Sequence, residues 1–142
     1  MSQTEENKAL FRRYIDEAWG KGNVDVMDEL MVADYVAHPY GAVGRDFMKG
    51  DVAGYRAAFP DLQIAVDVMV AEDDLVVARA TMRGTHRGQF MGIAPTGREV
   101  TLTMIGVDRV KDGKIVEGWG EMNLLGLMQQ LGAIPAPQQA TG

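Results

Sequence analysis

The sequence predicts a single α+β domain in which helices pack on one face of a mainly antiparallel sheet. Three observations lead to this prediction. Apolar residues recur at helical spacing as far as Phe59, the spacing changes to two from Leu62 onward, and a short helical stretch follows the last strand. The chain has 142 residues, enough for one core. We expect residues 1–132 to form the domain and 133–142 to be a flexible tail.

Three helices are predicted ahead of the strands. The first begins near Ser2 or Thr4 and ends at the glycines Gly20 and Gly22. Its apolar face consists of Leu10, Phe11, Tyr14, Ile15, Ala18 and Trp19. A short second helix, capped by Asn23, has an apolar stripe made of Val24, Met27, Leu30 and Met31. The third helix ends before Pro60, which lacks an N–H to donate, and its stripe consists of Phe47, Met48, Val52, Tyr55 and Phe59.

Four strands should follow, because side chains of successive strand residues point to opposite faces. In the first strand one face is predicted to carry Ile64, Val66, Val68 and Val70. A hairpin at residues 72–74 leads into a second strand, and a long connection rich in glycine and proline precedes a third strand from about 99 to 110. Asp112-Gly113 is typical of a tight turn before a fourth strand at about 114–122. Asn123 then caps a last helix over 124–131, which stops at Gly132.

Composition and charge exclude several classes of protein. The net charge is −6, with arginine and lysine scattered along the chain, so we expect no nucleic-acid partner. No apolar run approaches the roughly 18–20 residues that span a bilayer, and the N-terminus is polar and acidic, so we expect a cytoplasmic protein without a membrane partner. Cysteine is absent and only two histidines occur, so disulfides and a zinc site are not expected. No dinucleotide or phosphate loop is present, and we expect no cofactor.

Five motifs, in this order, resemble the SnoaL-like polyketide cyclase family over about Asn7 to Gly132: "DYVAHP", "AAFPDL", "GTHRGQFMGIAPTGR", "DGKIVEGWGE" and "LLGLMQQLG". The resemblance implies the nuclear-transport-factor-like cone, in which helices line the concave face of a curved sheet and enclose a pocket for a small apolar molecule. In the family's aromatic cyclases, an aspartate on the last strand is the acid/base of an aldol closure, and a histidine on the preceding strand assists it. Gly120 and Gly106 occupy these two positions here, so neither catalytic group is carried over.

Glycine and methionine dominate the pocket wall that the strands predict. By alternation, the third strand contributes Leu102, Met104, Gly106 and Asp108. On the same grounds the fourth strand contributes Val116, Gly118, Gly120 and Met122. The glycines either bend the sheet or leave room for a flat ligand, and one feature can serve both purposes. Tyr14 and Trp19 of the first helix complete the predicted substrate-binding set.

Three polar side chains are candidates for acid/base catalysis. A short extended segment, closed by Pro39 and Gly41, is predicted at "DYVAHPYG" between the second and third helices. His38 at the end of its strand would reach the mouth of the cone, or it ties down the turn before Pro39. His86 lies in a glycine-flanked loop, where it would otherwise bond to nearby backbone groups. Asp108 shares the face of Gly106 but sits near the strand end, where pairing with an arginine is the alternative.

Two functions stay open at this point. The chain is either a cofactor-independent cyclase or isomerase that moves protons on a small apolar carbonyl compound, or a protein that binds such a compound without altering it. The sheet face opposite the pocket also carries information, because an apolar outer face is usually covered by a partner. The alternation places on it Val77, Ile105, Val107, Ile115 and Trp119. We therefore expect a homodimer that packs through this face.

Overall fold

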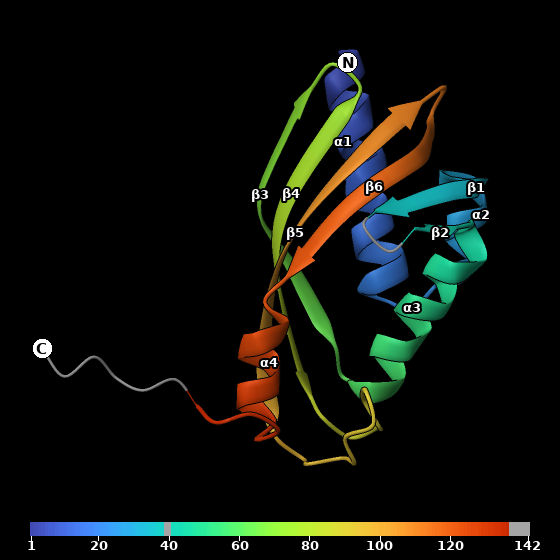
Figure 1. Ribbon diagram of the computed structural model, residues 1–142. Helices are drawn as coiled ribbons and strands as arrows, with labels where there is room; N and C mark the ends of the chain where they lie inside the picture. The colour runs from blue at the N-terminus through green and yellow to red at the C-terminus, as the bar shows by residue number, and fades with distance from the viewer. Residues whose placement is uncertain (39–40, 137–142) are drawn as a thin grey trace, which may run out of the picture.

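The computed structural model describes residues 1–38 and 41–136. The elements are α1 (Gln3–Arg13), the π-helix η1 (Tyr14–Trp19), the 3-10 helix η2 (Val24–Val26), α2 (Met27–Leu30), β1 (Met31–His38), β2 (Ala42–Val43), α3 (Arg45–Ala58), β3 (Gln63–Glu72), β4 (Leu75–Thr85), β5 (Glu99–Lys111), β6 (Lys114–Met122) and α4 (Leu124–Gln130). The strands form one curved sheet in the order β2-β1-β6-β5-β4-β3 (Figure 1). Only β1 and β6 are parallel neighbours in it. The α+β fold class is thereby confirmed.

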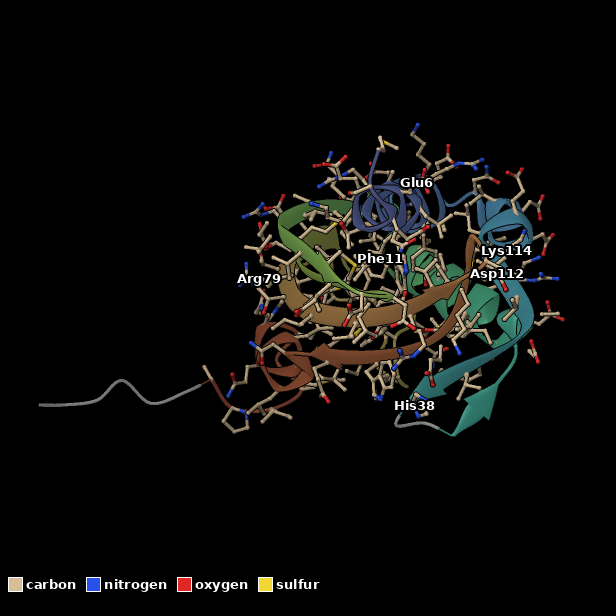
Figure 2. All side chains as sticks on the ribbon, turned by 90° about the horizontal axis from the view of Figure 1, so that it is seen from above. Glu6, Phe11, His38, Arg79, Asp112 and Lys114 are labelled. Carbon is tan, nitrogen blue, oxygen red and sulfur yellow. The ribbon has the colours of Figure 1, made fainter. Side chains whose placement is uncertain are left out.

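Helices α1 and α3 lie within the concave side of the sheet, whereas α4 packs at its far end (Figure 1). Figure 2 shows Phe11 directed from α1 toward the sheet. One core cluster joins α1, η1 and α3 to the middle of the sheet, and a second cluster lies around Phe59, Leu102 and Leu127 near α4. The space enclosed by the sheet is therefore filled with side chains at the α4 end. Between α1 and α3, side chains line this space and do not fill it.

The first helical segment changes geometry partway along. Ser2 begins it, because its hydroxyl accepts a hydrogen bond from the backbone N–H of Glu5. From Tyr14 the hydrogen-bond pattern widens to that of a π-helix, a feature that is frequent at functional sites. Side chains five residues apart then meet, and Trp19 Nε1 donates to the Tyr14 hydroxyl at 3.1 Å.

Three details of the predicted helices are wrong. Asn23 makes no capping hydrogen bond, and a 3-10 turn, η2, follows it in place of an α-helical first turn. Met31 is the first residue of β1, since α2 ends after four residues. Phe47 is 46% exposed, because it shares the outer side of α3 with Gly50 and Gly54.

A β-bulge in β3 reverses the predicted alternation along its second half. The pairing of β3 with β4 shifts between Val66 and Val68, which makes Asp67 an extra residue. Val68 and Val70 are consequently 56% and 54% exposed, although they were expected to share a face with Ile64. Residues 69 and 71 pack against the core in their place.

A second bulge lies in β6 and affects the predicted dimer face. Arg109 pairs with Glu117, but the next residue of β5, Val110, pairs with Ile115, so Val116 is the extra residue. Ile115 is fully buried in the core. Its predicted place on the outer face is therefore wrong, because the bulge turns it inward.

The rest of the predicted outer face stays together. Val77, Val107 and Trp119 are cross-strand neighbours on β4, β5 and β6, and Ile105 is 49% exposed beside them. Because of the bulge in β3, Val68 and Val70 extend this surface. We call these six residues the outer apolar face: Val68, Val70, Val77, Ile105, Val107 and Trp119.

The predicted turns and the last cap are confirmed. Asp112 and Gly113 have φ values of 50° and 72°, as expected for a two-residue hairpin turn. Asn123 Oδ1 accepts a hydrogen bond from Gly126 N at 3.1 Å and caps α4. Of the predicted tail, residues 137–142 lie outside the described residues. Within residues 1–38 and 41–136, no helix is both long and apolar enough to cross a bilayer.

Candidate functional site

A cavity of about 130 Å³ lies between the concave face of the sheet and the helices α1, η1 and α3. Its lining is mainly apolar, from Phe11 and Ile15 on the helical side to Ala78 and Ala80 on β4. An apolar protein cavity of about 150 Å³ is large enough to bind benzene. The cavity is therefore suited to a small apolar molecule or to one end of a larger one.

Most of the predicted binding residues line this cavity. The lining includes Tyr14, Trp19, Met104, Gly106, Gly118, Gly120 and Met122. Leu102 does not belong to it, because this residue lies further along β5 and is fully buried in the second core cluster. The glycine-rich wall predicted from strand alternation is thus present, and it is shorter than expected.

The glycines of this wall serve different purposes. A Cβ added at Gly120 would meet no atom within 4 Å, and one at Gly106 would meet only Phe11 Cζ at 3.8 Å. These two glycines leave open space. A Cβ at Gly118 would overlap both the Asp108 carboxyl group and the Tyr35 hydroxyl. Gly118 is therefore needed for the close approach of these two polar groups.

Asp108 brings a carboxyl group into the apolar wall. Its side chain is buried, and Oδ1 accepts a hydrogen bond from the Tyr35 hydroxyl at 3.2 Å. Burial raises the pKa of Asp108 to about 7, and the hydrogen bond from Tyr35 only partly opposes this effect. The alternative expected from the sequence, pairing with an arginine, is wrong. The neighbouring Arg109 binds Asp74 and Glu117 instead.

Two tyrosines surround Asp108. Burial and the nearby Asp108 carboxyl raise the pKa of both Tyr14 and Tyr35, so both stay protonated and can donate hydrogen bonds. The Tyr14 oxygen accepts the indole N–H of Trp19. Its own O–H has no acceptor among the residues that the structure describes, so this buried donor is available to a ligand in the cavity.

Asp51 contributes a second carboxyl group from α3. It lines the cavity, and its pKa is raised by burial. Tyr14 lies within electrostatic range of both Asp51 and Asp108. In the part of the chain that the structure describes, no lysine or arginine lines the cavity. The site therefore combines the partly or fully buried carboxyl groups of Asp51 and Asp108 with two phenols, while the exposed Glu121 also borders it, and among the described lining residues there is no lysine or arginine.

The sequence contained signals for the two residues that were missed. Successive side chains of β1 point to opposite faces, so Tyr35 lies on the inward face with Ala37, opposite Val36 and His38. Asp51 follows Met48 by three residues and precedes Tyr55 by four, which places it on the apolar stripe of α3. A polar residue within such a stripe indicates a site, whereas polar residues elsewhere on a helix are ordinary.

His38 belongs to the outer face of the sheet. Its ring stacks on Trp119 with centroids 4.9 Å apart, and Nε2 lies 3.0 Å from Glu117 Oε2. Figure 2 places His38 far from Phe11, at the edge of the molecule. His38 also borders the cavity, but the contacts of its imidazole are with Glu117 and Trp119 rather than with Asp108 or Tyr35.

His86 is buried outside the cavity, where its ring packs against Phe59. Its Nδ1 accepts the backbone N–H of Thr96, so it organises the loop between β4 and β5. Of the three acid/base candidates, the structure thus places only Asp108 next to Tyr35 in the cavity wall. Among the described residues, no group of three histidine, aspartate or glutamate side chains is placed to hold a metal ion.

The chain matches the model of the SnoaL-like polyketide cyclase family over residues 9–131. It is similar to the solved structure of AclR, a candidate hydroxylase from Streptomyces galilaeus, with 33% identity and a TM-score of 0.87 over 96% of this chain and 87% of AclR. IdmH, a candidate polyketide cyclase from Streptomyces antibioticus, is 34% identical, with a TM-score of 0.76 over 92% of this chain and 99% of IdmH. No curated protein matches the chain.

A third similar structure is a candidate SnoaL-like polyketide cyclase from a Jannaschia species. It is 28% identical, with a TM-score of 0.85 over 95% of this chain and 98% of the other. The similarity in all three cases extends over nearly the whole of both chains.

The two glycines of β6 should respond differently to substitution. Gly120→Leu fills open cavity space, so it should weaken binding of a small ketone such as β-tetralone at least tenfold, with little change in melting temperature. Gly118→Ala forces Asp108 and Tyr35 apart and should lower stability by about 1–3 kcal/mol. Thermal unfolding and calorimetric titration measure both effects. A Gly120→Leu protein that melts several degrees lower yet binds like the parent would show that this glycine serves sheet geometry.

Proposed function

We propose that this chain, which belongs to the SnoaL-like polyketide cyclase family, is a cofactor-independent enzyme that transfers protons on a small apolar carbonyl compound. The observation that carries the proposal is the single buried carboxyl group of Asp108 in the apolar cavity wall, next to two phenol donors. Its pKa of about 7 means that both protonation states are populated at neutral pH. That is the condition under which one group serves well as base and then as acid.

The proposed reaction begins when ionised Asp108 removes a proton from the carbon next to the substrate carbonyl. The electron pair of that C–H bond moves toward the carbonyl oxygen and forms an enolate. The Tyr14 O–H, polarised by the indole N–H of Trp19, donates to this oxygen as its charge grows. Tyr35 holds Asp108 Oδ1 in place. Protonated Asp108 then returns the proton to a carbon or oxygen of the product.

This chemistry is compatible with the names of the similar proteins. A ring closure of the aldol type starts with the same proton removal, so the proposal covers a cyclase as well as an isomerase. The alternative is a protein that binds the ligand without altering it. It is favoured by the resemblance drawn from the sequence, which implies that Gly106 and Gly120 occupy the positions of the acid/base residues of the family's aromatic cyclases. Asp108 weighs against it, because burying an ionisable group in a binding site without a use for its charge is unfavourable.

Hydrogen exchange on β-tetralone in heavy water tests the proposal. The parent should accelerate deuterium incorporation next to the carbonyl, with a rate that rises with pH and levels off above about 7, because only ionised Asp108 acts as the base. Asp108→Asn should reduce the catalysed rate by about two to four orders of magnitude. Tyr14→Phe should reduce it by about two to three orders, the usual effect of one donor to a developing oxyanion.

Asp46→Asn is the control, because it removes an exposed carboxyl group of α3 that does not line the cavity, and it should leave the exchange rate unchanged. Nuclear magnetic resonance of the ketone measures every rate. An Asp108→Asn protein as active as the parent would eliminate Asp108 as the base. A parent protein that binds apolar ketones and accelerates none of them would instead support the binding alternative.

For assembly we propose a twofold homodimer through the outer apolar face. Two arginines beside this face are already paired within the chain, Arg79 with Asp67 and Arg109 with Glu117 and Asp74. A partner therefore needs apolar surface rather than opposite charge. A second copy of the same face meets that requirement, and closed twofold dimers are the commonest assembly of soluble chains.

Trp119→Glu should convert the dimer to monomers, because it places an uncompensated carboxylate in an apolar interface. Leu125→Glu is the matched control. Leu125 is an apolar residue on α4 with 59% exposure, and its substitution should leave the dimer intact. Sedimentation velocity at about tens of micromolar measures both. A parent that sediments as a monomer at that concentration would exclude this interface.

A further inference from the structure

We propose that the ligand site continues beyond the cavity into a groove over the exposed side of α3, so that the enzyme accepts an elongated apolar ligand with a hydrogen-bond donor partway along it. The inference rests on the proposed function, because the reactive end of this ligand would occupy the cavity beside Asp108. The groove has a volume of about 300 Å³ and lies between α3 and residues 89–91 of the loop that joins β4 to β5.

The cavity and the groove meet at Asp51. This residue lines both hollows, and it is the junction through which a ligand would pass. Its carboxyl group makes no hydrogen bond or ion pair with any residue in the described ranges 1–38 and 41–136. A partly buried carboxyl without a protein partner is unfavourable, and a ligand hydroxyl or amino group at the junction would satisfy it.

Tyr55 lines the groove and packs against a side chain of the cavity wall. Its ring packs against Trp19 of the cavity, with centroids 5.6 Å apart, and against Phe90 of the groove at 5.3 Å. Its hydroxyl lies 3.2 Å from Met122 Sδ, which also lines the cavity. Tyr55 thus links the aromatic side chains of the cavity with those of the groove, and Asp51 borders both spaces.

The floor of the groove is kept open by Gly50 and Gly54. Both lie inside α3, where glycine weakens a helix relative to alanine. A Cβ at either position would meet no atom within 4 Å, so packing within the chain does not require glycine there. The exposed side chain of Met91 borders the same space and offers a flexible apolar contact. Room for a bound molecule is therefore a physical use for both glycines.

The charges of the two hollows restrict the ligand further. Asp51 and Asp108 are carboxyl groups, and none of the described residues that line either hollow is lysine or arginine. An anionic group near Asp51 would face repulsion without a compensating cation. The site therefore favours neutral or amino-bearing molecules over carboxylates.

Three probes test this inference by calorimetric titration. The first is β-tetralone, and the second, the hydroxyl probe, is the same ketone with, on its far ring, a six-carbon chain that carries a hydroxyl group. The third, the carboxylate probe, has a carboxylate in place of the hydroxyl group. The hydroxyl probe should bind to the parent at least tenfold more tightly than β-tetralone, because the added methylenes leave water. The carboxylate probe should show little of this gain in affinity. Asp51→Asn should reduce the difference in binding affinity between the hydroxyl probe and the carboxylate probe.

Gly54→Leu fills the groove and should remove the advantage of the hydroxyl probe, while β-tetralone binds as before. Ala53→Leu is the matched control, because it adds the same side chain to an exposed neighbouring position of α3 that does not line the groove. Equal binding of β-tetralone and the hydroxyl probe to the parent would overturn the inference. Equal weakening of both probes by Gly54→Leu would do so too. If the extended probe binds as expected but no proton exchange is catalysed, the proposed function fails and the extended site stands.

Discussion

The site depends on the burial of one carboxyl group, Asp108, in a wall that is mainly apolar. Removing a carboxylate from water is unfavourable, so the group holds its proton up to a pH near 7, where an ordinary aspartate would be ionised. Among residues 1–38 and 41–136, the Tyr35 hydroxyl is the one donor that reaches Asp108, and it does so across a gap that exists because residue 118 is glycine. Folding therefore sets the reactivity of the carboxyl group through three residues on three strands.

The curved sheet makes this arrangement accessible to a ligand. Bulges in β3 and β6 add one residue each and increase the local twist, so the strands bend around α1 and α3 and do not lie flat against them. Gly106 and Gly120 then leave space where a flat sheet would present side chains to the helices. The bulge in β3 also moves Val68 and Val70 outward, which enlarges the outer apolar face, whereas the bulge in β6 turns Ile115 inward. The curvature of the sheet thus contributes both to the cavity and to the proposed dimer surface.

The sequence predicted the order and type of the elements well, because the change from helical to alternating spacing at Leu62 is a local signal. It could not reveal the bulges. Around Asp67, apolar side chains occur on both faces of β3, and in β6 the successive residues Ile115 and Val116 are both apolar. A shift of the strand by one residue therefore leaves the apolar pattern of the sequence unchanged. Strand alternation placed Asp108 on the cavity wall correctly. Its partner was missed because Tyr35 lies 73 residues earlier and meets it only through the parallel pairing of β1 with β6.

The central claim is that Asp108 exchanges its proton near neutral pH, and a carboxyl titration followed by carbon-13 nuclear magnetic resonance tests it most directly. Protein labelled at the aspartate side-chain carboxyl carbon would be titrated from about pH 4 to 9, and the Asp108 resonance identified by its loss in Asp108→Asn. The account predicts one aspartate with a midpoint near 7, well separated from the others. A midpoint for Asp108 below about 5, close to that of an exposed aspartate, would contradict it.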